Sequence, residues 1–201
     1  LAMMLSFSAL YAQQRAVYTI HDAWNFAREG ESATVLDIPH TWNAQDVDDD
    51  QPGYYRGTAS YSRKIYIPES MQGRCVDIYF EGANQELSLF VNGNLVGEHK
   101  GGYTRFNFDL TPYVQFGRDN DFQIILTNRH NPDIPPLSAD FTFYGGIYRD
   151  VYLRFVNPVH ITTDDYASGG IYVSTPAVSA SSALVEVRTL LDNSSASRQS
   201  V

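Results

Sequence analysis

The sequence has a single cysteine, Cys75, among its 201 residues. One cysteine cannot form an internal disulfide, and it excludes a zinc site built from several thiolates. Because Cys75 lies in a run where apolar and polar residues alternate, we expect its thiol to be buried as a small hydrophobic group. The five histidines are scattered and lack the spacing of metal ligands.

Basic residues are also scarce, with 14 Lys and Arg against 23 Asp and Glu, which gives a net charge of −9 at pH 7. The basic residues form no cluster that could offset this charge locally. The charge balance therefore excludes a nucleic acid or an anionic membrane as an expected partner.

Long hydrophobic runs are missing, so no segment is predicted to span a membrane. The apolar start, residues 1–12, is typical of the hydrophobic part of a secretory signal peptide without its basic front end. Small residues near Ala12 suit cleavage before Gln13, whereas a weak core strand is the alternative. The signal-peptide interpretation predicts a secreted, periplasmic or cell-surface protein.

Helical patterning is absent, because no stretch shows the periodicity of a long amphipathic helix. Short alternating runs, separated by turn residues about every 8–12 positions, predict a β-sandwich. Asn92-Gly93 is a strong hairpin signal between two of these runs. The expected strands are 24–26, 35–38, 59–67, 76–80, 87–91, 95–99, 104–109, 121–127 and 147–153, with one helical turn at 110–114. The expected core comprises Val76, Ile78, Phe80, Leu89, Val91, Phe108, Ile124 and Leu126.

The character of the chain changes after Asn157-Pro158. Three further strands are expected at 159–161, 170–173 and 183–191, before a serine-rich end. Three strands seldom form a stable unit alone. We therefore predict a sandwich domain over residues 13–157 and an incomplete second domain over residues 158–201, which would continue in a longer protein.

Residues 133–146, which we call the aromatic loop, are the main candidate for a ligand-binding segment. Two consecutive prolines impose an extended backbone at its start. Three aromatic side chains precede Gly145-Gly146, where only glycine allows positive φ or a close backbone approach. Asp140 lies beside these aromatics, and this arrangement suits contact with a sugar. The alternative is that the rings fill the edge of a sheet.

The loops before residue 57 hold further candidates. Trp42, Tyr54 and Tyr55 offer aromatic faces to a sugar, although filling the sandwich end is the preferred interpretation for each. His40 beside Trp42 is either functional or an ordinary structural histidine. Four aspartates between residues 46 and 50 lack the glycine and closing glutamate of a calcium loop, so we interpret them as a solvated acidic loop.

Four segments in order carry a resemblance to a known family: IPHTWN at 38–43, YYRG at 54–57, FVNG at 90–93, and Asp140 followed by GIYRD at 146–150. Together they resemble the amino-terminal, sugar-binding jelly roll of glycoside hydrolase family 2, most like that of the bacterial β-galactosidases. The strands from Val159 resemble the start of that family's second domain. The resemblance implies an all-β chain, with a jelly-roll β-sandwich followed by the start of an immunoglobulin-like β-sandwich.

The resemblance also implies a retaining exo-β-glycosidase that removes terminal β-linked sugars, with two catalytic glutamates on a (β/α)₈ barrel. That barrel is not in this sequence, so no catalytic residue is expected here. The resemblance assigns Asp140 to bind the terminal sugar and to ligate a sodium ion, which suits a hard oxygen ligand. Asn43 is the candidate for a second sugar contact of the family. Arg149 and Asp150 also match the family motif, and we interpret them as structural charges at the start of a strand.

No cofactor is required under this interpretation, and a sodium or magnesium ion is left open for the full enzyme. The expected partners are a carbohydrate substrate and the barrel domain, with a homo-oligomer left open. A stand-alone carbohydrate-binding module and a structural spacer remain as alternatives. The sugar is also open, because family 2 includes β-glucuronidases and β-mannosidases as well as β-galactosidases.

Overall fold

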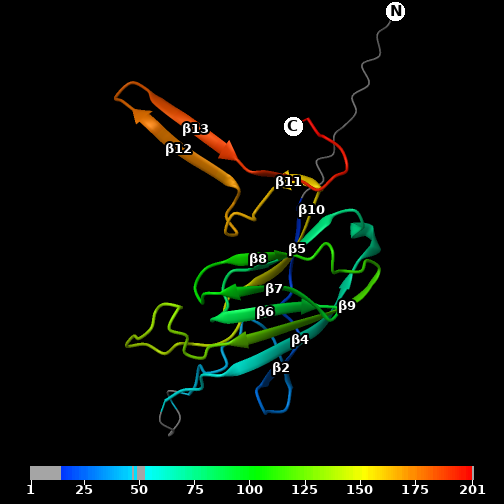
Figure 1. The fold of residues 1–201 in the computed structure, drawn as a ribbon, viewed down its shortest axis with the longest axis vertical. Helices are drawn as coiled ribbons and strands as arrows, with labels where there is room; N and C mark the ends of the chain where they lie inside the picture. The colour runs from blue at the N-terminus through cyan, green and yellow to red at the C-terminus, as the bar shows by residue number, and fades with distance from the viewer. Residues whose placement is uncertain (1–14, 47, 49–52, 201) are drawn as a thin grey trace, which may run out of the picture.

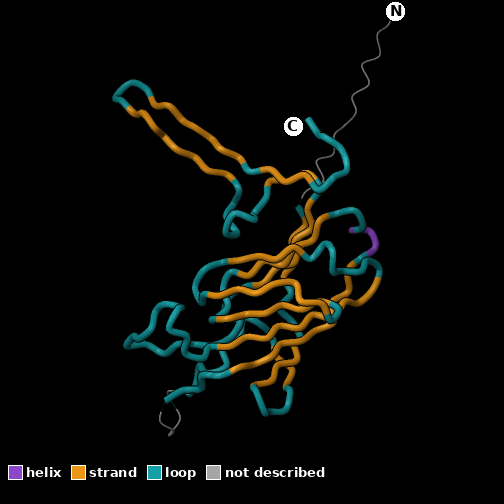
Figure 2. Tube along the Cα trace, in the orientation of Figure 1, coloured by secondary structure: helices purple, strands orange, loops and turns teal. Residues whose placement is uncertain are grey.

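The computed structural model describes residues 15–46, 48 and 53–200. Within these ranges the chain has fourteen strands and one short 3₁₀ helix, η1 (Glu69–Met71). Figure 1 shows most of the strands in one sandwich, and Figure 2 shows helix only at η1. The predicted all-β sandwich is confirmed. The predicted signal peptide, residues 1–12, lies outside the described residues.

Two antiparallel sheets form the sandwich. The larger sheet has the order β3-β2-β4-β9-β6-β7, and these strands span Thr34–Leu36, Trp24–Arg28, Thr58–Ile67, Arg118–Thr127, Glu86–Val91 and Asn94–Lys100. The smaller sheet has the order β1-β10-β5-β8, and its strands span Ala16–Thr19, Val151–Val156, Cys75–Phe80 and Phe106–Asp109. Asn92 and Gly93 both have positive φ, 51° and 80°, in the turn from β6 to β7, as the hairpin signal predicts.

Alternation along the strands places one face of each sheet inside the sandwich. In β5 and β6 every second residue is buried, because successive strand side chains point to opposite faces. The buried residues of both sheets form a single cluster. Seven predicted core residues are buried in it: Val76, Ile78, Phe80, Leu89, Val91, Ile124 and Leu126. Phe108 is only half-buried, because it lies on the edge strand β8 and packs over Gly97 of the edge strand β7.

The buried thiol predicted at Cys75 is wrong, because this side chain is only half-buried. Val76 takes the inward position on β5, so Cys75 faces outward. Its Sγ lies 2.9 Å from the hydroxyl oxygen of Ser194. The alternation of the strand, rather than the polarity of the residue, therefore decides where Cys75 lies.

The strand expected from Ile147 begins only at Val151. Residues 146–150 instead cross from the larger sheet to the smaller one, and their hydrogen bonds go to loops. The Ile147 carbonyl accepts from the His40 N–H at 2.7 Å, and the carbonyl of Asp150 accepts from the Glu81 N–H at 3.0 Å. The strand β1 and the helix η1 have no counterpart among the sequence predictions.

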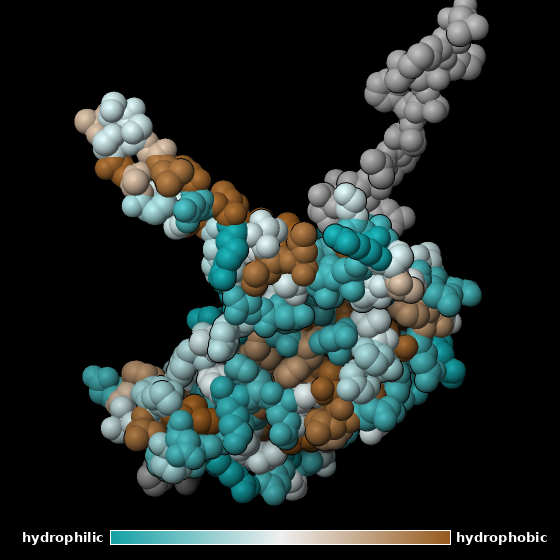
Figure 3. Space-filling model, turned by 45° about the horizontal axis from the view of Figure 1, so that its top comes forward, coloured by the Kyte–Doolittle hydropathy of each residue, from teal (hydrophilic) through white to brown (hydrophobic). Residues whose placement is uncertain are grey.

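The strands after residue 158 do not join either large sheet. β11 (Val159–Ile161) pairs with β14 (Leu191–Asn193), and β12 (Ile171–Val178) pairs with β13 (Ala183–Thr189). The three strands expected here all occur, with the last one divided in two. The β12–β13 hairpin extends away from the sandwich, and Figure 3 shows hydrophobic residues along it.

A buried ion pair joins the smaller sheet to the segment after β11. Arg154 on β10 donates from Nε to Asp77 Oδ1 at 2.6 Å and from Nη2 to Thr163 Oγ1 at 2.7 Å. Its guanidinium also lies 4.2 Å from the centre of the Tyr79 ring. Burial raises the pKa of Asp77, whereas the hydrogen bond and charge of Arg154 oppose that rise. The segment is thus held against the outer face of the sandwich.

The aromatic loop is anchored by two fully buried asparagines, Asn43 and Asn128, which we call the asparagine clamp. Each donates from Nδ2 to the same two carbonyls, those of Tyr55 and Phe143, over 3.1–3.3 Å. A carbonyl oxygen has two lone pairs, so each can accept from both asparagines. Asn43 Oδ1 also accepts from the Gly145 N–H at 2.9 Å. The clamp therefore ties the loop before β4 to the aromatic loop.

Gly145 and Gly146 are both required by the packing at this end. A Cβ at Gly145 would lie 2.2 Å from the Trp42 indole, and Gly146 has a φ of 132° with no room for a Cβ beside the His40 carbonyl. The predicted close approach and positive φ are thus confirmed. Trp42 is buried, and His40 Nδ1 lies 2.9 Å from the Tyr61 hydroxyl. These contacts support the structural alternative for His40 and for Trp42.

We expect Asn43→Ala to destabilise the chain by about 2–4 kcal/mol without any sugar present, because the buried Gly145 N–H loses its acceptor and a cavity is left. The midpoint of urea unfolding measures this loss. Asn25→Ala is the matched control: Asn25 is exposed and donates one hydrogen bond, to Ser62 O at 3.3 Å. A wild-type midpoint for Asn43→Ala would contradict the anchoring role.

Stability should fall as the pH drops below 7, because burial lowers the folded-state pKa of His40 and of His99. The unfolded chain binds these protons near the ordinary value of about 6.5, so the stability present above that pH is lost as the pH falls toward the folded-state pKa. His40→Gln should flatten the dependence of the urea midpoint between about pH 7.5 and 5.5. Asn25→Ala, at an exposed residue without a titratable group, should leave this dependence unchanged. An unaltered slope in His40→Gln would refute the assignment.

Candidate functional site

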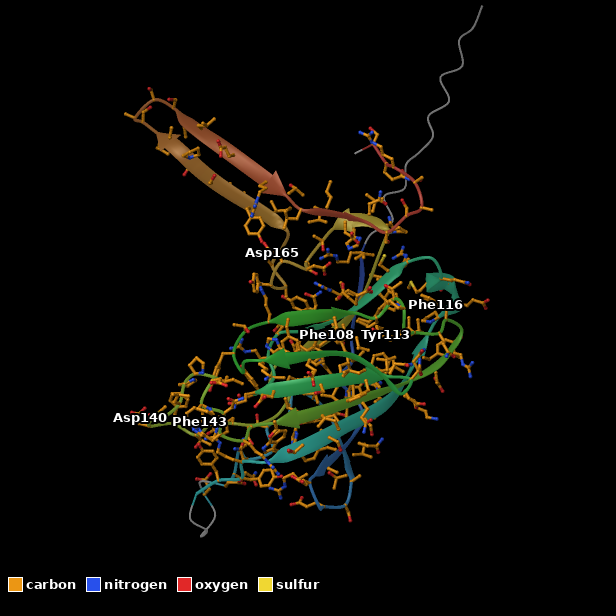
Figure 4. All side chains as sticks on the ribbon, viewed as in Figure 1. Phe108, Tyr113, Phe116, Asp140, Phe143 and Asp165 are labelled. Atoms are coloured by element: carbon orange, nitrogen blue, oxygen red, sulfur yellow. The ribbon has the colours of Figure 1, made fainter. Side chains whose placement is uncertain are left out.

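The aromatic loop projects from one end of the sandwich, with Asp140 at its tip and Phe143 nearer the sheets (Figure 4). Phe143 is buried, whereas Phe141 is 52% exposed and Tyr144 is 44% exposed. The ring-filling alternative therefore holds for Phe143, whereas sugar contact by the other two rings stays a prediction. Phe143 fills the sandwich end, and the other two rings face solvent.

The exposed rings surround an open hollow of about 270 Å³, which we call the aromatic hollow. It is lined by Thr41, Tyr103, Phe141, Thr142, Tyr144 and Tyr148. No charged side chain lines this hollow among the residues that the structure describes. Aromatic faces pack well on the C–H face of a pyranose, and nearby hydroxyl groups can orient its polar edge. The hollow therefore has the chemistry of a sugar-contacting surface.

Tyr103 and Tyr148 are site residues that the sequence does not reveal. Tyr148 donates from its hydroxyl to the Gly102 carbonyl at 2.6 Å, which brings the segment before β8 against the segment before β10. Burial raises the pKa of both tyrosines, so both hydroxyls stay protonated near neutral pH. One local feature of the sequence could have indicated a close backbone approach beside Tyr103: the glycine pair Gly101-Gly102 precedes it, as Gly145-Gly146 ends the aromatic loop. A Cβ at Gly102 would lie 2.1 Å from an oxygen of the Asn84 side chain.

The structure separates the two predicted sugar contacts. Asp140 is exposed, and its carboxylate makes no hydrogen bond or ion pair with any residue in the described ranges. Asn43 is buried below the loop, with its amide engaged in the asparagine clamp. Asp140 is thus available to a ligand, whereas a sugar-binding role for Asn43 stays a prediction.

Metal-binding chemistry is sparse in this chain. Among the described residues no group of three or more His, Cys, Asp or Glu side chains is placed to hold a metal ion. Asp140 alone does not make a sodium or magnesium site, so further ligands would have to come from elsewhere. Of the predicted acidic loop, Asp46 accepts from the Tyr55 N–H at 2.7 Å, and residues 47 and 49–52 lie outside the description.

The charges after the glycine pair are engaged with neighbouring protein groups. Asp150 Oδ1 lies 3.2 Å from His21 Nε2, and its other oxygen accepts from the Tyr152 hydroxyl at 3.1 Å. Arg149 reaches the carbonyls of Glu81 and Tyr103 at 3.4 and 3.5 Å. These contacts agree with the predicted structural charges. No helix in the described part of the chain has the length and apolar character needed to cross a membrane.

Comparison with known proteins gives a consistent result. Residues 5–158 match the family model described as glycosyl hydrolases family 2, sugar binding domain. A β-glucuronidase of Bacteroides fragilis is 38% identical over 197 residues, which cover 96% of this chain and 28% of that protein. A β-galactosidase of Thermoanaerobacter pseudethanolicus is 35% identical over 71% of this chain and 20% of its own length.

The fold agrees with a solved relative. The structure of Bacteroides uniformis β-glucuronidase 2, covalently bound to cyclophellitol-6-carboxylate aziridine, superposes with a TM-score of 0.82 at 35% identity. The match covers 90% of this chain and 22% of that one. This chain therefore spans between 20% and 28% of the length of these three relatives. It belongs to glycosyl hydrolase family 2, and it contains the amino-terminal sugar-binding domain of that family.

Proposed function

We propose that this chain is the non-catalytic, sugar-binding front of a retaining exo-β-glycosidase that removes terminal β-linked sugars. The aromatic loop would complete a pocket whose two catalytic glutamates lie on a barrel domain outside this sequence. The observation that carries the proposal is Asp140, at the tip of a loop whose base is held by the asparagine clamp. Its carboxylate makes no hydrogen bond or ion pair with the residues that the structure describes.

Asp140 suits this task for two reasons. A hydrogen bond from a sugar hydroxyl to a free carboxylate is worth about 1.5–3 kcal/mol, more than a bond between neutral groups. A loop that is already held in place loses little further entropy when the sugar binds. We also propose that any sodium or magnesium ion bound by Asp140 takes its remaining ligands from the barrel. Export from the cytoplasm remains our proposal from residues 1–12.

A β-galactoside is the sugar we propose first. The aromatic hollow beside Asp140 is lined by aromatic and threonine side chains without a cation, which favours an uncharged sugar on this side of the pocket. A β-glucuronide is the second candidate. It is supported by the name of the B. fragilis relative, which matches 96% of this chain.

Hydrolysis of nitrophenyl β-galactoside, β-glucuronide and β-mannoside by the full-length protein tests the proposal. A clear preference for one glycoside supports the exo-glycosidase and identifies its sugar. Hydrolysis of none, together with calorimetric binding of oligosaccharides, would favour a carbohydrate-binding module. That second function is consistent with a hollow formed wholly by this chain.

In the same assay, Asp140→Ala should lower kcat/KM by about 10²-fold, or about 2.7 kcal/mol of transition-state stabilisation, because a charged contact to the sugar is lost. Asp119→Ala is the matched control, since Asp119 is also an exposed aspartate but lies on β9. We expect that variant to retain wild-type kinetics. Near-normal activity of Asp140→Ala on the preferred glycoside would remove Asp140 from the site.

A further inference from the structure

A second hollow continues from the aromatic hollow along the outer face of the smaller sheet. Its volume is about 520 Å³, and the residues that matter here are Tyr79, Glu81, Tyr103, Arg105, Arg149 and Tyr166. We call it the tyrosine–arginine hollow. Tyr103 lines both hollows, so the two are neighbours at this ring. The tyrosine–arginine hollow reaches Tyr166, in the segment before β12.

Three tyrosine side chains line the tyrosine–arginine hollow: Tyr79, Tyr103 and Tyr166. Tyr166 is the most prominent, with 92% of its surface exposed and a φ of 52°. A bulky residue rarely adopts positive φ, so the turn presents the ring to solvent at a conformational cost. Its neighbour Asp165 is labelled in Figure 4, on the segment that approaches β8. Tyr103 is 44% exposed, so both rings are open to a sugar face.

Two guanidinium groups face the same hollow. Arg105 is exposed and makes no hydrogen bond or ion pair with the described residues. Arg149 reaches only main-chain carbonyls and the Tyr148 ring, at 5.2 Å from the ring centre, so no carboxylate within the described ranges neutralises it.

The surrounding charges leave this hollow cationic. Glu81 is the one carboxylate among its lining residues. Asp164 lines an adjoining hollow, which shares Arg105 and Tyr166 with this one, and it accepts a hydrogen bond from Asn107 at 3.4 Å. The lining therefore carries two cations and one anion in a chain whose net charge is −9. Such a local excess attracts an anion that the rest of the surface repels.

We propose that the tyrosine–arginine hollow binds an acidic glycan. Tyr103 and Tyr166 stack on its sugar rings, and Arg105 and Arg149 bind a carboxylate or sulfate group. Guanidinium pairs with both groups through two parallel hydrogen bonds. The inference rests on the proposed function and deepens its substrate class: the terminal sugar at the aromatic hollow is uncharged, and the part of the oligosaccharide or polysaccharide that lies in the tyrosine–arginine hollow is acidic.

Titration calorimetry on the full-length protein tests this inference with three probes: galacturonic acid oligosaccharides, sulfated galactan oligosaccharides and neutral β-1,4-galactan oligosaccharides. We expect at least one acidic probe to bind about tenfold more tightly than the neutral one. The affinity for that acidic probe should fall as salt is added, because salt screens the charges. The two acidic probes distinguish a carboxylate from a sulfate ligand. Equal affinity for all three, or no binding of either acidic probe, would overturn the proposal.

Variants locate the binding. Arg105→Gln and Tyr166→Ala should each lower the affinity for the acidic probe by about tenfold, because both side chains are exposed and would contact the ligand directly. Arg118→Gln and Tyr66→Ala remove equivalent exposed groups from the larger sheet and should bind as the wild type does. Unchanged affinity in both hollow variants would overturn the proposal. The nitrophenyl assay on the wild type reports separately on the proposed function.

Discussion

The pair of buried asparagines is the constraint on which the binding end of the molecule depends. Asn43 and Asn128 come from distant parts of the chain, yet both donate to the carbonyls of Tyr55 and Phe143. Buried carbonyls and amides must be paired, so these four groups fix one another in a single arrangement. The exposed rings of the aromatic loop and its free carboxylate are presented by that arrangement. Hydrogen bonds from Trp42 and Asn84 to the Gly145 and Gly146 carbonyls add to the clamp at the end of the loop.

The sandwich itself follows closely from the sequence, since its strands alternate with a period of two and end at turn residues. The Asn92-Gly93 turn and the Gly145-Gly146 pair could be predicted because their backbone requirements are local. The start of β10 at Val151 could not be predicted in this way. Residues 146–150 alternate like a strand, but their backbone hydrogen bonds go to loop residues such as His40 and Glu81.

The binding surface was harder to predict than the fold. Asp140 was recognisable as a polar residue among aromatics, and the structure leaves it exposed. The family resemblance suggests a sugar contact for Asn43, but its burial could not be predicted, because its partners Phe143 and Gly145 lie about a hundred residues away in the chain. The same applies to Tyr103. Its place beside the aromatic loop results from packing between segments that no local pattern connects.

The hydrogen bond from Arg154 to Thr163 has a mechanical consequence. Swinging the last four strands away from the sandwich would break this bond, which is worth about 1.5–3 kcal/mol because its donor is charged. This contact opposes bending of the chain at the junction near residues 157–158. Tyr166 thereby stays with Tyr79 and Tyr103 in the lining of the tyrosine–arginine hollow. An extended, stiff glycan could then contact the aromatic hollow and the tyrosine–arginine hollow together, without a closing movement of the protein.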